Sequence, residues 1–208
     1  MGAWVGLFLL GAYHGLNPGM GWLFAVALGL QEQRRAAVAK ALVPMAIGHM
    51  LAVGATVGSV VGMGAFLPSQ ALRLLAAALL IGFGVYRLVR MRHPRWVGMR
   101  VGPGALIGWS FLVAWSHGAG LMLVPFLLGL TSRCIPTPLS SMPTVGNPWL
   151  EGIRAIGLHT AGYGAALGLV AWVVYEGIGL APLRRLWINF DRLWAMTLIA
   201  TGLLTPLL

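Results

Sequence analysis

The sequence predicts an all-α integral membrane protein with six transmembrane helices in a single domain, residues 1–208. Of the 208 residues, 59% are hydrophobic and only 9% are charged, which leaves too little polar surface to coat a water-soluble globule. Apolar stretches of roughly the length needed to cross a bilayer also recur along the chain, at residues 3–30, 38–63, 71–89, 104–130, 153–177 and 186–207.

The distribution of cations predicts how these segments are oriented. Only Arg73, Arg133 and Arg154 belong to the even-numbered connections. The other eleven cations are assigned to the odd-numbered loops: Arg34, Arg35, Lys40, Arg87, Arg90, Arg92, Arg95, Arg100, Arg184, Arg185 and Arg192. Because cytoplasmic loops carry an excess of cations, we expect a multi-pass protein of the inner (plasma) membrane with both termini outside. The net charge of +10 then indicates a lipid bilayer, and no nucleic acid, as the partner.

The connection over residues 131–147 is rich in proline and is expected to be an extended loop facing outward. It contains Cys134, the single cysteine of the chain. One cysteine cannot form an internal disulfide or a paired-thiol redox site. Activities that need two thiols in this chain are therefore excluded.

Two pairs of segments resemble one another and predict an inverted repeat, with halves at approximately 1–90 and 101–208. "AIGHMLAVGATVG" in the second segment resembles "AIGLHTAGYGAALG" in the fifth, and "AYHG" in the first resembles "AWSHG" in the fourth. Three helices per half give the two copies opposite orientations, which builds a central site in many transporters. Gly54, Gly58 and Gly62 recur every fourth residue and are expected to form a face for close helix packing.

Four of the five histidines fall inside apolar segments. These are His14, His49, His117 and His159, whereas His93 lies in a basic loop. A buried polar side chain is costly unless it is paired, and ionisable groups within membranes usually face the bundle interior or a cavity. Each histidine alone is explained by one interhelical hydrogen bond. Their distribution over two half-repeats instead predicts a shared central site.

The stretch "HGLNPGM" at 14–20 predicts a break in the first helix. Pro18 removes a backbone donor, and Gly15 and Gly19 permit non-helical angles. The segment "SHGAGLM" at 116–122 is the expected counterpart. The predicted hinge residues are Gly15, Pro18, Gly19, Gly118 and Gly120, and the predicted substrate-binding residues are His14, Asn17, Met20, His49, Ser116, His117 and His159.

The types of side chain available limit the substrate. The carboxylates Glu32, Glu151, Glu176 and Asp191 all lie near segment ends, so a site for hard cations such as Ca²⁺ or Mg²⁺ is not expected. Imidazole and thioether groups suit nickel, cobalt, zinc or copper. The predicted metal ligands are His14, Met20, His49, His117 and His159, for a transported ion and not for a resident cofactor. An anionic or zwitterionic solute held by helix N-termini and imidazole is also compatible.

"HGLNPGM" at 14–20 and "IGHM" at 47–50 resemble two signatures of the nickel/cobalt transporter family. The resemblance implies that His14 and His49 are ligands of a permease for divalent transition metals. The chain departs from the family pattern at Gly19 and Met20, where the family has an acid and a histidine. The six-helix architecture is also similar to the wider group of small exporters that includes amino-acid exporters of the lysine-exporter type.

Three functions follow from the sequence. The first is a permease for a transition-metal ion, the second an exporter of a small polar metabolite such as an amino acid. The third is a non-transporting membrane subunit or assembly factor. A homodimer is compatible with each of them. An enzyme is not expected, because no constellation of nucleophile, base and carboxylate lies on one helix face.

Overall fold

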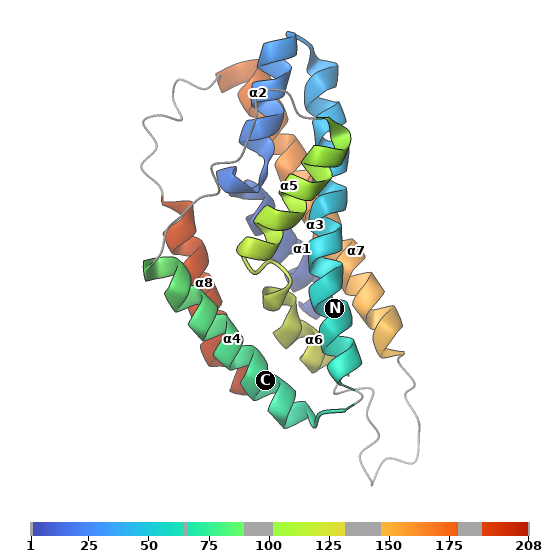
Figure 1. The fold of residues 1–208 in the computed structure, drawn as a ribbon, viewed down its shortest axis with the longest axis vertical. Helices are drawn as coiled ribbons and strands as arrows, with labels where there is room; N and C mark the ends of the chain where they lie inside the picture. The colour runs from blue at the N-terminus through green and yellow to red at the C-terminus, as the bar shows by residue number, and fades with distance from the viewer. Residues whose placement is uncertain (1, 65, 90–101, 132–146, 179–188, 208) are drawn as a thin grey trace.

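The computed structural model describes residues 2–64, 66–89, 102–131, 147–178 and 189–207 (Figure 1), and every regular element in these ranges is helical. The longer helices are α1 (Gly2–Leu16), α2 (Trp22–Glu32), α3 (Arg35–Met63), α4 (Ser69–Val89), α5 (Pro103–Ser116), α6 (Val124–Thr131), α7 (Pro148–Val173) and α8 (Phe190–Leu204). Short turns are η1 (Pro18–Met20), η2 (Leu121–Leu123), the π-turn η3 (Val174–Ile178) and η5 (Thr205–Leu207).

Among the described residues, three helices are long and apolar enough to cross a membrane, at Arg35–Met63, Ser69–Val89 and Pro148–Gly177. A fourth candidate span is the pair Pro103–Ser116 and Leu121–Gly129, which is bent by 54°. Helices α1 and α2 are shorter apolar helices. The all-helical class and the presence of candidate spans agree with the sequence analysis, whereas the number of six spans stays a prediction.

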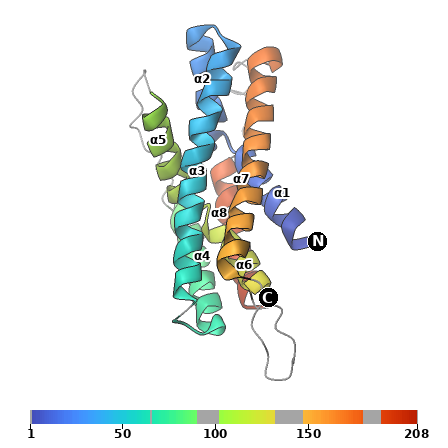
Figure 2. The ribbon, with the colours of Figure 1, turned by 90° about the vertical axis from the view of Figure 1, so that its right-hand side faces the viewer.

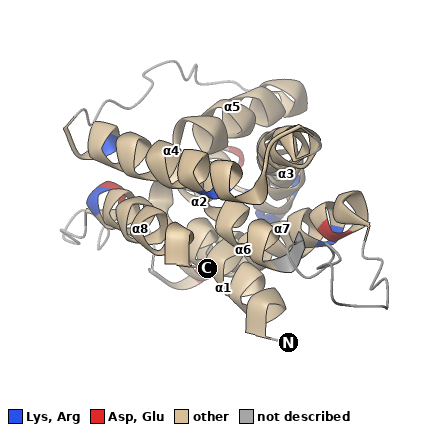
Figure 3. Cartoon of the chain, turned by 90° about the horizontal axis from the view of Figure 1, so that it is seen from below, with Lys and Arg blue, Asp and Glu red and all other residues tan. Residues whose placement is uncertain are grey.

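Four helices form the central layer of the bundle, in the order α5, α3, α7 and α1 (Figure 2). Helices α4 and α8 pack against each other along one flank of this layer (Figure 1). Seen from below, most of the described ribbon is formed by residues other than Lys, Arg, Asp and Glu (Figure 3). Large apolar side chains such as Leu9, Leu51 and Leu169 are exposed, as expected of helices that face lipid.

Glycine sets the separation of α1 and α7. A Cβ atom at Gly11 would collide with the carbonyl oxygen of His159, and one at Gly162 would collide with that of Phe8. Of the packing face predicted at Gly54, Gly58 and Gly62, only Gly54 has a neighbour, Ile156, 3.9 Å from the position of an added Cβ atom, whereas a Cβ at Gly58 or Gly62 would meet no other helix of the described chain within 4 Å. The close approach on α3 occurs at Gly48, against α5. Regular spacing identified a smooth face but not the neighbour that covers it.

The break predicted in the first segment is present between α1 and α2. Asn17 is extended, with φ −65° and ψ 122°, and its side chain accepts a hydrogen bond from the backbone N–H of Gly19 at 2.9 Å. Pro18 begins the turn η1, and Gly21 has φ +129°. The indole N–H of Trp22 donates to the Leu16 carbonyl at 3.0 Å, so a carbonyl freed by the break has a partner.

The counterpart break lies between α5 and η2. The last helical turn of α5 ends with Ser116, and Gly118 has φ +67°. This left-handed conformation is costly for residues that carry a Cβ atom. Gly118 thus acts at the second break much as Gly21 does at the first.

Replacing Gly118 by alanine is expected to lower stability by about 1–2 kcal/mol from the left-handed backbone alone, with a further cost from the Phe83 ring, 2.9 Å from the new Cβ. The change is measured by thermal or denaturant unfolding in detergent. Gly104→Ala, where nothing lies within 4 Å of the new Cβ, is the control. Equal effects of the two substitutions would contradict the assignment of Gly118 as the conformational break point.

Candidate functional site

Three helices bring His14, His49 and His159 together in the core, from α1, α3 and α7 respectively. The ring centroids lie 4.9 Å apart for His14 and His49, 5.4 Å for His49 and His159, and 6.0 Å for His14 and His159. All three side chains are fully buried. We call this group the imidazole cluster.

The imidazole cluster contains polar atoms that the protein does not satisfy. Neither ring nitrogen of His49 has a hydrogen-bond partner, and Nδ1 of His14 has none. His159 faces the carbonyl of Leu7, but neither of its nitrogens makes a hydrogen bond of good geometry. Buried polar groups in folded proteins are almost always paired, so several such atoms in one place require an explanation.

Met20 and Tyr163 complete the surroundings of the imidazole cluster. The sulfur of Met20 lies 2.9 Å from Nε2 of His14. The Tyr163 hydroxyl donates to the Met20 carbonyl at 2.7 Å, and its ring stacks on His49 with centroids 3.9 Å apart. Tyr163 therefore ties α7 to the turn η1 and fixes the position of the thioether.

The rings of the imidazole cluster do not aim at a common point. His49 and His159 are stacked with an interplanar angle of 17°, and His14 lies edge-on to both. Within the described parts of the chain, no three His, Cys, Asp or Glu side chains are arranged to hold a metal ion. Joint coordination of one ion by these rings would require side-chain rotation.

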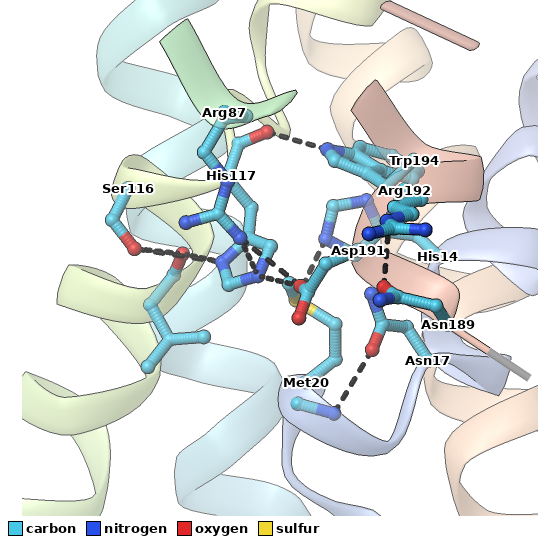
Figure 4. Close-up of polar contacts among 12 residues, drawn as sticks. His14, Asn17, Met20, Arg87, Ser116, His117, Asn189, Asp191, Arg192 and Trp194 are labelled. Atoms are coloured by element: carbon cyan, nitrogen blue, oxygen red, sulfur yellow. Dashed lines mark hydrogen bonds and ion pairs between the residues drawn. The ribbon is translucent and has the colours of Figure 1, made fainter. Parts of the chain in front are cut away.

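His117 does not join the other three histidines but lies in a second group with Arg87 and Asp191 (Figure 4). An Nη2 atom of Arg87 lies 2.7 Å from Nε2 of His117 and 3.1 Å from Oδ1 of Asp191. The exposed fractions of the side chains are 7% for Arg87, 2% for His117 and 18% for Asp191. We call this group the ion-pair cluster.

Local structure positions each member of the ion-pair cluster. Arg87 lies in the last turn of α4, and His117 follows the end of α5. Asp191 lies in the first turn of α8, where the side chain of Asn189 caps the helix by accepting from the Arg192 N–H at 3.0 Å. The positive end of a helix dipole favours a carboxylate at this position.

Trp194 connects the two clusters. Its indole N–H donates to the carbonyl of His117 at 2.6 Å, and its ring centroid lies 4.3 Å from that of His14. Trp194 is almost completely buried. A displacement of α8 therefore changes the surroundings of both clusters.

The remaining predicted site residues lie around the two helix breaks. Ser116 donates to the Val113 carbonyl at 2.9 Å and lies beside Nδ1 of His117. Asn17 caps η1, and its Nδ2 is buried without a hydrogen bond. Gly19 lies within η1 and Gly118 at the second break.

Two glycines predicted as hinges occupy packing positions. Gly15 lies inside α1, where a Cβ atom would collide with the Tyr163 carbonyl. Gly120 has the helical φ of −70°, and a Cβ atom there would collide with Thr56 of α3. At these two positions glycine therefore permits close packing of neighbouring segments and does not serve as the predicted hinge.

Arg87, Asp191, Tyr163 and Trp194 belong to the site but are not identified by the sequence alone. Arg87 was assigned to a cytoplasmic loop and Asp191 to a segment end, yet the two form an ion pair largely removed from solvent. The available signal was that both charges fall within predicted apolar segments, where an ionisable residue indicates a functional site. His93, Cys134 and most of the loop 131–147 lie outside the described residues.

The fold and these clusters define an all-helical protein that has, in the ranges the structure describes, three or four candidate membrane spans and a buried polar centre. No family model matches the sequence, and no curated protein or solved structure matches it significantly.

Proposed function

We propose that this chain is a small inner-membrane permease whose substrate binds at the imidazole cluster, and that the substrate is a transition-metal ion. The observation that carries the proposal is the set of unpaired ring nitrogens on three fully buried histidines. Neutral imidazole is a preferred ligand of nickel, copper and zinc, and the thioether of Met20 adds a soft donor.

The helix breaks support transport. Non-helical backbone at membrane depth is tolerated where it lines a cavity or is buried in protein, and many transporters place their sites at discontinuous helices. Here both breaks adjoin a histidine, His14 at the first and His117 at the second. A moving first segment would carry His14 and Met20 together.

The packing pattern supports the predicted inverted repeat and six spans. If α1 is exchanged with α5 and α3 with α7, the order α5, α3, α7, α1 becomes α1, α7, α3, α5, which is the same layer read from the other end. The same exchange replaces α4 with α8, and these two helices pack against each other. In this proposal α1–α2 and α5–α6 are broken spans, and α8 is the sixth. Alternating access then results from movement of one half against the other.

Export of a polar metabolite is the competing function. The imidazole rings do not converge on a point, and the same unpaired nitrogens would also hydrogen-bond an organic solute. The role of a non-transporting subunit is less well supported. Interhelical hydrogen bonds would fasten such a bundle, and neither ring nitrogen of His49 makes one.

A thermal-shift panel on the detergent-purified protein tests the proposal. It compares Ni²⁺, Co²⁺, Zn²⁺ and Cu²⁺ with amino acids and organic anions, because a ligand that binds the folded state raises the melting temperature. At a concentration of about 100 Kd the expected stabilisation is about 2.7 kcal/mol. We expect one metal ion to give this shift, and His14→Ala and His49→Ala to remove it.

Two of the buried methionines, Met20 and Met45, provide a matched pair of variants. Met20→Leu is expected to weaken the thermal shift caused by metal, because the sulfur of Met20 contacts His14. Met45→Leu is expected to preserve that shift, because the sulfur of Met45 lies beside Gly21. A response to an organic solute without any metal response would replace the metal with that solute. If His14, His49 and His159 all tolerate glutamine with changes in stability alone, the permease proposal is wrong.

A further inference from the structure

The hydrogen bonds of His117 fix which of its nitrogens carries the proton. Nδ1 lies 2.8 Å from the Val113 carbonyl oxygen, which only accepts, so Nδ1 is the donor. Nε2 lies 2.7 Å from Nη2 of Arg87, which only donates, so Nε2 is the acceptor. His117 is therefore the neutral tautomer whose Nε2 lone pair accepts from the guanidinium of Arg87.

This tautomer matches that of a metal-ligating histidine. Such residues present one nitrogen to the ion and donate the other N–H to a carbonyl or carboxylate, which orients the ring. The Val113 carbonyl provides this support. The arrangement is thus in place before any metal binds.

A second electron-pair donor lies beside Nε2. Oδ1 of Asp191 is 3.3 Å from Nε2 of His117, although two acceptors repel each other at this distance unless a cation lies between them. The guanidinium of Arg87 supplies that cation, since the same Nη2 atom contacts both acceptors. Two ligands of one ion at about 2.1 Å each and 3.3 Å apart subtend an angle of about 100°, close to tetrahedral.

We propose that His117 and Asp191 form a second subsite for the transported metal ion, and that Arg87 occupies this subsite as an internal cation when the metal is absent. The inference rests on the proposed function and extends it. Metal arriving at the subsite displaces the guanidinium, so that a cation lies beside Asp191 in both states. The exchange keeps Asp191, which is only 18% exposed, next to a positive charge throughout.

Competition of this kind lowers the apparent affinity for metal. Binding to a subsite that is accessible in only a fraction of molecules is weakened by that fraction. Removing the guanidinium therefore strengthens binding at His117 and Asp191, whereas removing a residue with a purely structural role would not.

Equilibrium binding of Co²⁺ to the purified full-length chain tests the proposal, with the visible absorption of the bound ion as the readout. Arg87→Gln is expected to bind Co²⁺ at least about tenfold more tightly than the wild type, and its melting temperature is expected to rise more on addition of metal. Arg87→Gln/Asp191→Asn is expected to lose this gain. The matched control is Arg35→Gln, which breaks the more exposed pair between Arg35 and Glu176 and is expected to leave binding unchanged.

His117→Gln gives a second test that keeps the ion pair and does not depend on the folding of Arg87→Gln. We expect it to change the absorption spectrum of bound Co²⁺ and to weaken binding. If Arg87→Gln and His117→Gln both bind Co²⁺ with the affinity and spectrum of the wild type, while His49→Ala loses Co²⁺ binding, the second subsite is overturned and the proposed function stays intact. If the wild type binds no transition metal but Arg87→Gln does, the subsite is supported and the proposed metal transport is overturned.

Discussion

Replacing Asp191 by alanine is expected to lower the free energy of unfolding by about 3–5 kcal/mol, because it leaves the charge of Arg87 buried without its counter-ion. Arg87 is only 7% exposed, and its Nε atom already has no hydrogen-bond partner. The loss also removes the carboxylate from the first turn of α8, where it is favoured by the helix dipole. Denaturant unfolding in detergent measures the effect.

The ion pair between Glu151 and Arg154 is a matched control. Glu151 is 15% exposed, close to the 18% of Asp191, but Arg154 is 57% exposed. Glu151→Ala is expected to cost less than about 1 kcal/mol. Removing both charges with Arg87→Met/Asp191→Leu is expected to recover most of the stability lost in the single variant. If Asp191→Ala lowers the free energy of unfolding no more than Glu151→Ala does, Arg87 is solvated in the protein.

Local chain chemistry was sufficient to predict the helix breaks. Pro18 with its flanking asparagine and glycines ends α1 where expected, and Gly118 supplies the left-handed residue at the counterpart break. These features depend on backbone angles within a few residues, which residue type strongly restricts. The gathering of His14, His49 and His159 also followed from sequence, because polar side chains in apolar helices are driven to the bundle interior.

Features that depend on the register and tilt of neighbouring helices were not predictable in this way. His117 pairs with Arg87 and not with the other histidines because α4 ends and α8 begins beside the second break. Reading each apolar segment as a full span placed Arg87 and Asp191 at the membrane surface. Their actual meeting depends on contacts between residues more than 100 positions apart.

The glycines show the same division between local and tertiary information. Gly54, Gly58 and Gly62 have the spacing of a packing face, yet the tightest backbone crossings in the described chain involve Gly11, Gly48 and Gly162. Spacing reports which residues share a helix face. Which neighbouring backbone covers that face is decided by the arrangement of all the helices.

Substituting alanine for glycine is therefore expected to have opposite effects at two positions. Gly162→Ala places a Cβ atom against the carbonyl of Phe8, where backbone and not a flexible side chain must move. We expect a loss of about 3 kcal/mol or more, at the upper end of overpacking effects. The α1·α7 crossing also aligns His14 with His159, so the same substitution is expected to reduce the metal-induced thermal shift.

At Gly58 the same substitution meets nothing within 4 Å. Alanine is favoured over glycine inside a helix by about 0.5–1 kcal/mol, so Gly58→Ala is expected to be neutral or stabilising. Comparing the two variants by unfolding in the same detergent separates helix propensity, which changes equally in both, from the crossing of α1 and α7. Similar destabilisation at both positions would mean that Gly58 also packs against a backbone, as it would in a homodimer formed through this face of α3.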